Sequence, residues 1–246
     1  MYSNAELHMF YKVANAPISA FPYPHIYVPN VFPDDYYADM QRNMPDPKHM
    51  MPLEVVRKVK GYNERFVLEL SEPSLATIEE NKRPFWTDFG SWMTSGRFKS
   101  LLLAKFRPFI EARFKTALQT LSFHDEALLV EDVTQMALGP HSDSPKKVLT
   151  LLFYLPKDDS QAHIGTSIYI PKNPTFVCEG GPHYAFEGFY RLTTMPFKPN
   201  SLFCFVKTNN SFHGVEPVTD PDTKRWLLLY DIYQNKPAAP AAPKPN

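Results

Sequence analysis

The chain has 246 residues, and its 26 Lys and Arg residues balance its 26 Asp and Glu residues. A chain without net charge has no long-range field to attract nucleic acid, so we expect no nucleic-acid partner. No apolar stretch approaches the ~20 residues of a membrane span, and we expect no membrane partner. The length suits one barrel domain with additional helices.

The two cysteines, Cys178 and Cys204, are far apart and lack the close spacing of zinc ligands. Neither a disulfide framework nor a zinc site is indicated. The N-terminus shows no charged segment followed by an apolar core and a small-residue cleavage site, which would be typical of a secretory signal. We therefore expect a cytoplasmic protein.

The first half of the chain predicts helices around one early strand. Residues 1–20 suggest a short leader or helix, and 32–44 a helix that begins near Asp34 and Asp35. Residues 97–121 carry apolar side chains at helical spacing, interrupted by Pro108. The aromatic run at 85–93 is more typical of core packing than of a binding site. The segments at 85–93 and 97–121 should pack against the outside of a barrel.

The second half predicts buried strands separated by turns. Residues 148–155 and 201–206 are apolar and β-rich, and each run is followed by polar turn formers. A last strand is expected at 225–233, after a turn-rich segment at 217–223. The connection at 166–199 is either a surface loop or a lid that shapes a pocket. The Pro/Ala tail at 236–246 should be disordered or extended.

A possible metal site begins at His141 and Asp143. These residues are two apart, so at an extended strand end both side chains point the same way. His213 would add a third ligand from a distant strand, giving the two imidazoles and one carboxylate of non-haem Fe(II) sites. A His-x-Asp pair alone is a weak signal, but all three residues flank predicted strands. The rival ligands His163 and His183 have no carboxylate at the same spacing.

Arg225 begins the otherwise apolar last strand, twelve residues after His213. A guanidinium that points into the protein from such a strand needs an anion, whereas one at the strand start can also reach solvent. The neighbouring cation, Lys224, faces the opposite side of the strand and is expected in solvent.

Together, the Pro140–Asp143 segment, the distal His213 and the later Arg225 resemble the Fe(II)/2-oxoglutarate-dependent dioxygenases, and in particular their prolyl-hydroxylase-like branch. The likeness is strongest over 132–233 and looser over 21–131. It implies a mainly β protein with flanking helices around a double-stranded β-helix (jelly-roll, cupin-like) core. One domain at 1–235 would comprise an N-terminal strand and helices at about 21–125 and a catalytic core at about 126–235.

The resemblance also assigns roles. His141, Asp143 and His213 would hold Fe(II), the co-substrate 2-oxoglutarate would chelate that iron, and dioxygen would be the second co-substrate. Arg225 would bind the distal carboxylate of 2-oxoglutarate. Tyr154 would either donate a further hydrogen bond to that carboxylate or be a core tyrosine with a satisfied hydroxyl.

Two features of the chain refine this assignment. Many relatives place Ser or Thr two or four residues after the Arg, whereas this chain has Leu227 and Leu229. The secondary contacts to the carboxylate should therefore differ. Asp143 stands where halogenating relatives have a small residue, which favours hydroxylation.

The expected activity is hydroxylation of an unactivated C–H bond, in a small molecule or in a peptidyl residue such as proline, with release of succinate and CO2. The iron-site resemblance does not fix the substrate. The alternative is a non-catalytic jelly-roll protein that binds a metal or a small molecule.

Overall fold

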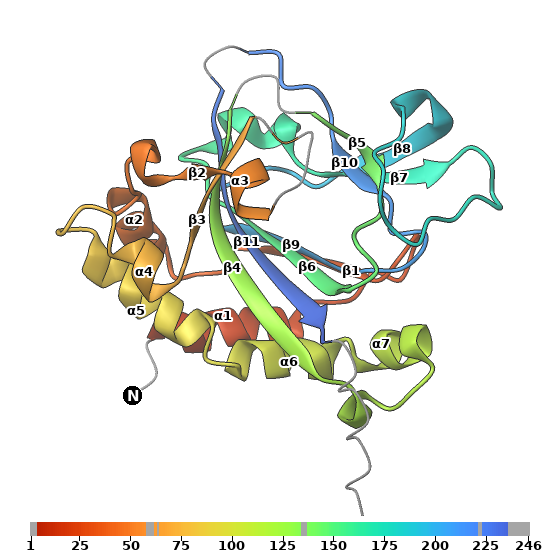
Figure 1. Ribbon diagram of the computed structural model, residues 1–246, viewed down its shortest axis with the longest axis horizontal. Helices are drawn as coiled ribbons and strands as arrows, with labels where there is room; N and C mark the ends of the chain where they lie inside the picture. Colours follow the sequence, from red (N-terminus) through yellow and green to blue (C-terminus); the bar gives the residue numbers. More distant parts are fainter. Residues whose placement is uncertain (1–3, 58–61, 63, 134–136, 221–222, 236–246) are drawn as a thin grey trace, which may run out of the picture.

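The computed structural model describes residues 4–57, 62, 64–133, 137–220 and 223–235. Two antiparallel sheets face each other (Figure 1), one of seven strands in the order β1-β9-β6-β11-β4-β3-β2 and one of four in the order β5-β10-β7-β8. This arrangement is that of a double-stranded β-helix, and it confirms the predicted fold class. The predicted tail at 236–246 lies outside the described residues.

The larger sheet consists of β1 (His25–Pro29), β9 (Ser201–Val206), β6 (Lys147–Tyr154), β11 (Arg225–Gln234), β4 (Phe123–Asp132), β3 (Arg65–Glu69) and β2 (Met51–Pro52). The smaller sheet consists of β5 (Leu138–His141), β10 (His213–Val215), β7 (Ser167–Pro171) and β8 (Phe189–Thr194). The early strands β1 and β3 thus belong to the same sheet as the strands of the predicted core.

The helices are α1 (Asn4–Asn15), α2 (Asp34–Arg42), α3 (Leu53–Arg57), α4 (Glu72–Leu75), α5 (Arg83–Met93), α6 (Arg97–Lys105) and α7 (Arg107–Phe114). Short 3-10 turns occur at Pro47–His49, Leu118–Thr120, Asp159–Ile164 and Phe186–Gly188. Helices α1, α5 and α6 lie along the face of the larger sheet that is turned away from the smaller one (Figure 1). None of the described helices is long and apolar enough to cross a membrane.

Both faces of the central strand β6 are covered, which explains its continuous apolar sequence. Leu151 and Phe153 pack with the helices, whereas Leu152 and Tyr154 face the smaller sheet. The predicted break at Pro108 is confirmed, because α6 ends at Lys105 and Pro108 stands in the first turn of α7. Proline has no N–H to donate, and only the first turn of a helix tolerates that loss.

The segment at 166–199, expected as one long connection, instead contains β7 and β8, which form one edge of the smaller sheet. Its strand signal is weak because β8 is an edge strand whose middle residues are all exposed, including Tyr190, Arg191 and Leu192. An exposed strand needs no apolar alternation, so sequence periodicity does not reveal it.

We expect Phe153→Ala to lower the free energy of unfolding by about 3–5 kcal/mol, the usual cost of emptying a buried aromatic site. Phe153 is fully buried, and its ring stacks on Phe32 with centroids 5.7 Å apart. Urea denaturation would measure the loss. The control Tyr11→Ala removes a ring that is 69% exposed and should change stability by no more than about 0.5 kcal/mol. Equal losses in both variants would contradict the packing described here.

Candidate metal centre

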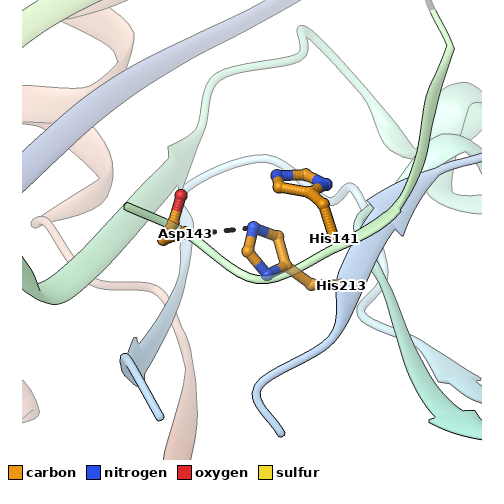
Figure 2. A group of neighbouring side chains, drawn as sticks. All are labelled: His141, Asp143 and His213. Carbon is orange, nitrogen blue, oxygen red and sulfur yellow. Dashed lines mark ion pairs between the residues drawn. The ribbon is translucent and has the colours of Figure 1, made fainter. Parts of the chain in front are cut away.

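The sheet pairing brings His141, Asp143 and His213 together (Figure 2). His141 ends β5, Asp143 follows two residues later, and His213 begins β10 directly opposite His141. The two imidazole centroids are 4.3 Å apart, and His213 Nε2 lies 3.9 Å from Asp143 Oδ2. One potential ligand atom from each residue lies within 4.8 Å of the other two, which is close enough to share one ion.

Both histidines present the same ring nitrogen to this space. His141 Nδ1 lies 2.9 Å from the carbonyl of Gly139, and His213 Nδ1 lies 3.0 Å from the carbonyl of Ser211. A carbonyl can only accept, so each Nδ1 carries the proton and each Nε2 keeps a free lone pair. Burial lowers the pKa of both histidines, which favours the neutral, metal-binding form.

The carboxylate of Asp143 is held on both oxygens. Thr150 Oγ1 donates a 2.7 Å hydrogen bond to Oδ2, and Lys147 Nζ lies 3.3 Å from Oδ1. Burial alone would raise the pKa of Asp143, but the nearby Lys147, His213 and His141 outweigh it and hold the pKa well below its ordinary value. The donor set is therefore two neutral imidazoles and one carboxylate, which fits the ligand set of a non-haem Fe(II) ion.

The triad lies on the wall of a cavity of about 590 Å³ between the two sheets, and Arg225 lines the same cavity. Arg225 is 1% exposed, and its Nη1 donates to Asp132 Oδ2 over 2.7 Å. Its Nε is buried without a hydrogen-bond partner among the described residues. The cavity thus contains a metal-ligand set and a guanidinium with an unused donor.

A second guanidinium, Arg65, joins Arg225 on the same carboxylate. Arg65 donates to both oxygens of Asp132, over 2.6 and 2.9 Å, and also lines the cavity. Two cations sharing one buried anion leave an excess positive charge, which suits a bound carboxylate. Neither Arg65 nor Asp132 was predicted as a site residue from the sequence. Only the strand register, in which Asp132 lies opposite both Arg65 and Arg225, reveals the cluster.

The contacts of Tyr154 are those of a core tyrosine. Its hydroxyl accepts the Thr166 N–H over 3.2 Å, and its ring packs on Phe197 at 4.9 Å between centroids. Burial raises its pKa to about 12, so the phenol stays protonated. Donation to a co-substrate remains a prediction for this residue.

The residues next to Arg225 divide between the two sides of β11. Leu227 and Leu229 line the cavity, as their spacing from Arg225 requires. The side chain of Lys224 is 58% exposed and pairs with Glu131 outside the cavity, so Lys224 points away from it.

The loop at 178–184 packs directly on the triad, and its Gly181, Pro182 and His183 line the cavity. Gly180 has a φ of +135°, and a Cβ there would lie 2.3 Å from the Asp143 carbonyl oxygen, so only glycine allows this approach. The His183 ring lies 4.4 Å from that of His141, but its Nε2 lies 3.1 Å from the Tyr62 hydroxyl. The loop therefore shapes the pocket, whereas His163 is exposed on a 3-10 turn.

We expect the metal-free protein to lose stability as the pH falls from about 7 to about 5. Burial lowers the pKa of His141 and His213 below the ordinary value of ~6.5, so in this range the unfolded chain binds more protons than the folded protein. Stability rises with pH wherever the unfolded state binds more protons. The contribution of both histidines is thus fully present above ~6.5 and is lost as the pH falls toward their folded-state pKa values.

Urea unfolding at about pH 7.5 and about pH 5.5 would measure this loss. The double variant His141→Gln/His213→Gln should show a smaller difference between the two pH values. If the variant and the wild type lose the same free energy, the two histidines are not the cause.

Comparisons with known proteins give structural similarities only, since no family model and no curated protein matches the sequence. A prolyl-4-hydroxylase from Pseudomonas putida is 14% identical with a TM-score of 0.49, over 94% of this chain and 100% of that chain. HygX from Streptomyces hygroscopicus, solved with nickel and 2-oxoglutarate, is 10% identical with a TM-score of 0.47. The match covers 95% of this chain and 87% of that chain. A 2OG-Fe(II) oxygenase family oxidoreductase from Burkholderia pseudomallei is 10% identical with a TM-score of 0.47. The match covers 94% of this chain and 91% of that chain.

These similarities concern the course of the backbone alone. In this chain the four predicted site residues His141, Asp143, His213 and Arg225 line one cavity.

Proposed function

We propose that the protein is an Fe(II)- and 2-oxoglutarate-dependent dioxygenase that hydroxylates an unactivated C–H bond and releases succinate and CO2. One observation carries the proposal: a single cavity contains the His141, Asp143 and His213 triad together with the buried guanidinium of Arg225. A protein that only binds a metal has no need for a buried carboxylate-binding group in the same cavity.

Each residue would contribute a separate function. The two Nε2 atoms and the Asp143 carboxylate would hold the iron, which supplies the oxygen-dependent oxidation of the C–H bond when 2-oxoglutarate is bound. Arg225, supported by Arg65 through Asp132, would bind the distal carboxylate of 2-oxoglutarate. Arg225 is 1% exposed, and water excluded from its surroundings would strengthen this charged contact.

The walls around the triad suit an organic substrate beside the loop at 178–184. Leu138, Val215 and Tyr62 pack together there, and all three line the cavity. This partly apolar wall suits a small molecule or a peptidyl side chain, including proline. Asp143 occupies the position that a halide needs in halogenating enzymes, so hydroxylation is the expected outcome.

Anaerobic titration of the purified protein with Fe(II) and 2-oxoglutarate tests the proposal. Chelation of iron by the keto acid should produce a weak visible charge-transfer band, and succinate, which lacks the keto oxygen, is the matched control that should produce none. Appearance of the band would justify a substrate screen by succinate release. Absence of the band while metal is demonstrably bound would favour the non-catalytic binding protein.

A further inference from the structure

A buried lysine, Lys147, lies against the candidate metal ligand Asp143. Lys147 begins β6, four residues after Asp143, and its side chain is 10% exposed. Its Nζ lies 3.3 Å from Asp143 Oδ1 and 2.9 Å from Asp231 Oδ2. A buried ammonium is costly unless it is paired, and these two carboxylates provide the pairing.

A local irregularity in the sheet turns Lys147 toward the site. Leu149, Leu151 and Phe153 on β6 face the helices, and strict alternation would place Lys147 on that same side. The register between β6 and β11 instead shifts between Ile232 and Tyr233, and Lys147 lines the cavity. Such shifts re-aim a side chain, and they are common beside active sites.

Lys147 is anchored independently of Asp143. Asp231 is fully buried on β11, and its Oδ2 also accepts from Tyr233 Oη over 3.0 Å and from Arg57 Nη2 over 3.3 Å. The ammonium therefore has a fixed anion behind it and presents its remaining hydrogens to Asp143. Because Asp231 fixes the ammonium, Lys147 can hold one oxygen of Asp143 in place and does not itself move toward a bound metal.

The two oxygens of Asp143 have different surroundings. Oδ1 lies beside Lys147, whereas Oδ2 accepts from Thr150 and lies on the side of His213 Nε2. We propose that Lys147 is a positioning residue that retains Oδ1, so that Asp143 offers only Oδ2 to the metal. This inference rests on the proposed function. A carboxylate bound through both oxygens would occupy two coordination positions of the metal. Binding through Oδ2 alone leaves one of these positions open for the co-substrate.

The test compares Lys147→Met with the wild type, using Mn(II) and 2-oxoglutarate as calorimetric probes. Lys147→Met should bind Mn(II) at least as tightly, because a cation beside the metal has been removed. Once loaded with Mn(II), the variant should bind 2-oxoglutarate about tenfold more weakly than the wild type does. This is the size of effect expected for a residue that orients a ligand. Lys147→Arg should recover most of this loss. Lys146→Met, which removes an exposed charge one residue away, should match the wild type.

Equal 2-oxoglutarate affinities in Lys147→Met and the wild type would overturn the inference, and so would a parallel loss of both affinities, which indicates structural damage. A crystal structure of the wild type with Mn(II) and 2-oxoglutarate tests the same point without a variant. It should show Oδ2 on the metal and Oδ1 on Lys147, and a carboxylate bound through both oxygens would refute the role. A wild type that binds neither probe would instead refute the proposed function.

Discussion

Asp143→Ala is expected to abolish 2-oxoglutarate decarboxylation and to weaken iron binding. The change removes the one anionic ligand and leaves two neutral imidazoles near the Lys147 ammonium, which repels a divalent cation. Losing a residue that merely orients a ligand costs 10–100-fold, so loss of the ligand itself should reduce turnover by more than about 100-fold. Succinate release and calorimetry with Mn(II) would measure the two effects.

Asp159→Ala is the matched control for this variant, because it removes a carboxylate whose side chain is 67% exposed and pairs only loosely with Lys198, at 3.7 Å. It should retain wild-type turnover and metal affinity. Asp143→Ala should remain folded, since Lys147 keeps its contact with Asp231. Near-normal turnover in Asp143→Ala would remove Asp143 from the ligand set.

Arg225→Ala is expected chiefly to raise the 2-oxoglutarate requirement. A hydrogen bond to a charged group contributes about 1.5–3 kcal/mol, which corresponds to a rise of roughly 10–150-fold in the dissociation constant. The fold should survive, because Arg65 still binds Asp132 through two hydrogen bonds. Titration of 2-oxoglutarate into Mn(II)-loaded protein measures the effect, and metal affinity should stay near that of the wild type.

Lys224→Ala provides the control at the neighbouring position. Its side chain is 58% exposed and pairs with Glu131, so the variant should bind 2-oxoglutarate as the wild type does. Unchanged affinity in Arg225→Ala would assign the distal carboxylate to another group, with Arg65 the next candidate. If Lys224→Ala loses 2-oxoglutarate affinity instead, the face of β11 that carries Lys224 is the one that contacts the co-substrate.

The sequence identified residues whose chemistry is local. His141 and Asp143 are two apart on a strand end, and this spacing alone places them on one side of the chain. The buried strands β6, β9 and β11 were predictable because continuous apolar runs bounded by turn formers leave few alternatives. The break at Pro108 followed equally directly from the missing N–H of proline.

Groups that depend on pairing between distant strands were not predictable. Arg65 and Asp132 are 67 residues apart and meet only through the register of β3 and β4. Strict alternation along β6 would turn Lys147 toward the helices. It faces the cavity because the register between β6 and β11 shifts beside it. The strand β8 was missed because an exposed edge carries no apolar pattern.

By itself the sequence determined the buried strands and the candidate ligands, because apolar periodicity and short spacings act within a few residues of the chain. The fold class followed from the resemblance of those residues to the dioxygenases. The tertiary structure decided how the charges pair: Arg225 with Arg65 on Asp132, and Lys147 between Asp143 and Asp231. The physical reason is that a buried charge is stable only beside a partner, and the partner's identity depends on strand register, which one strand's sequence does not encode.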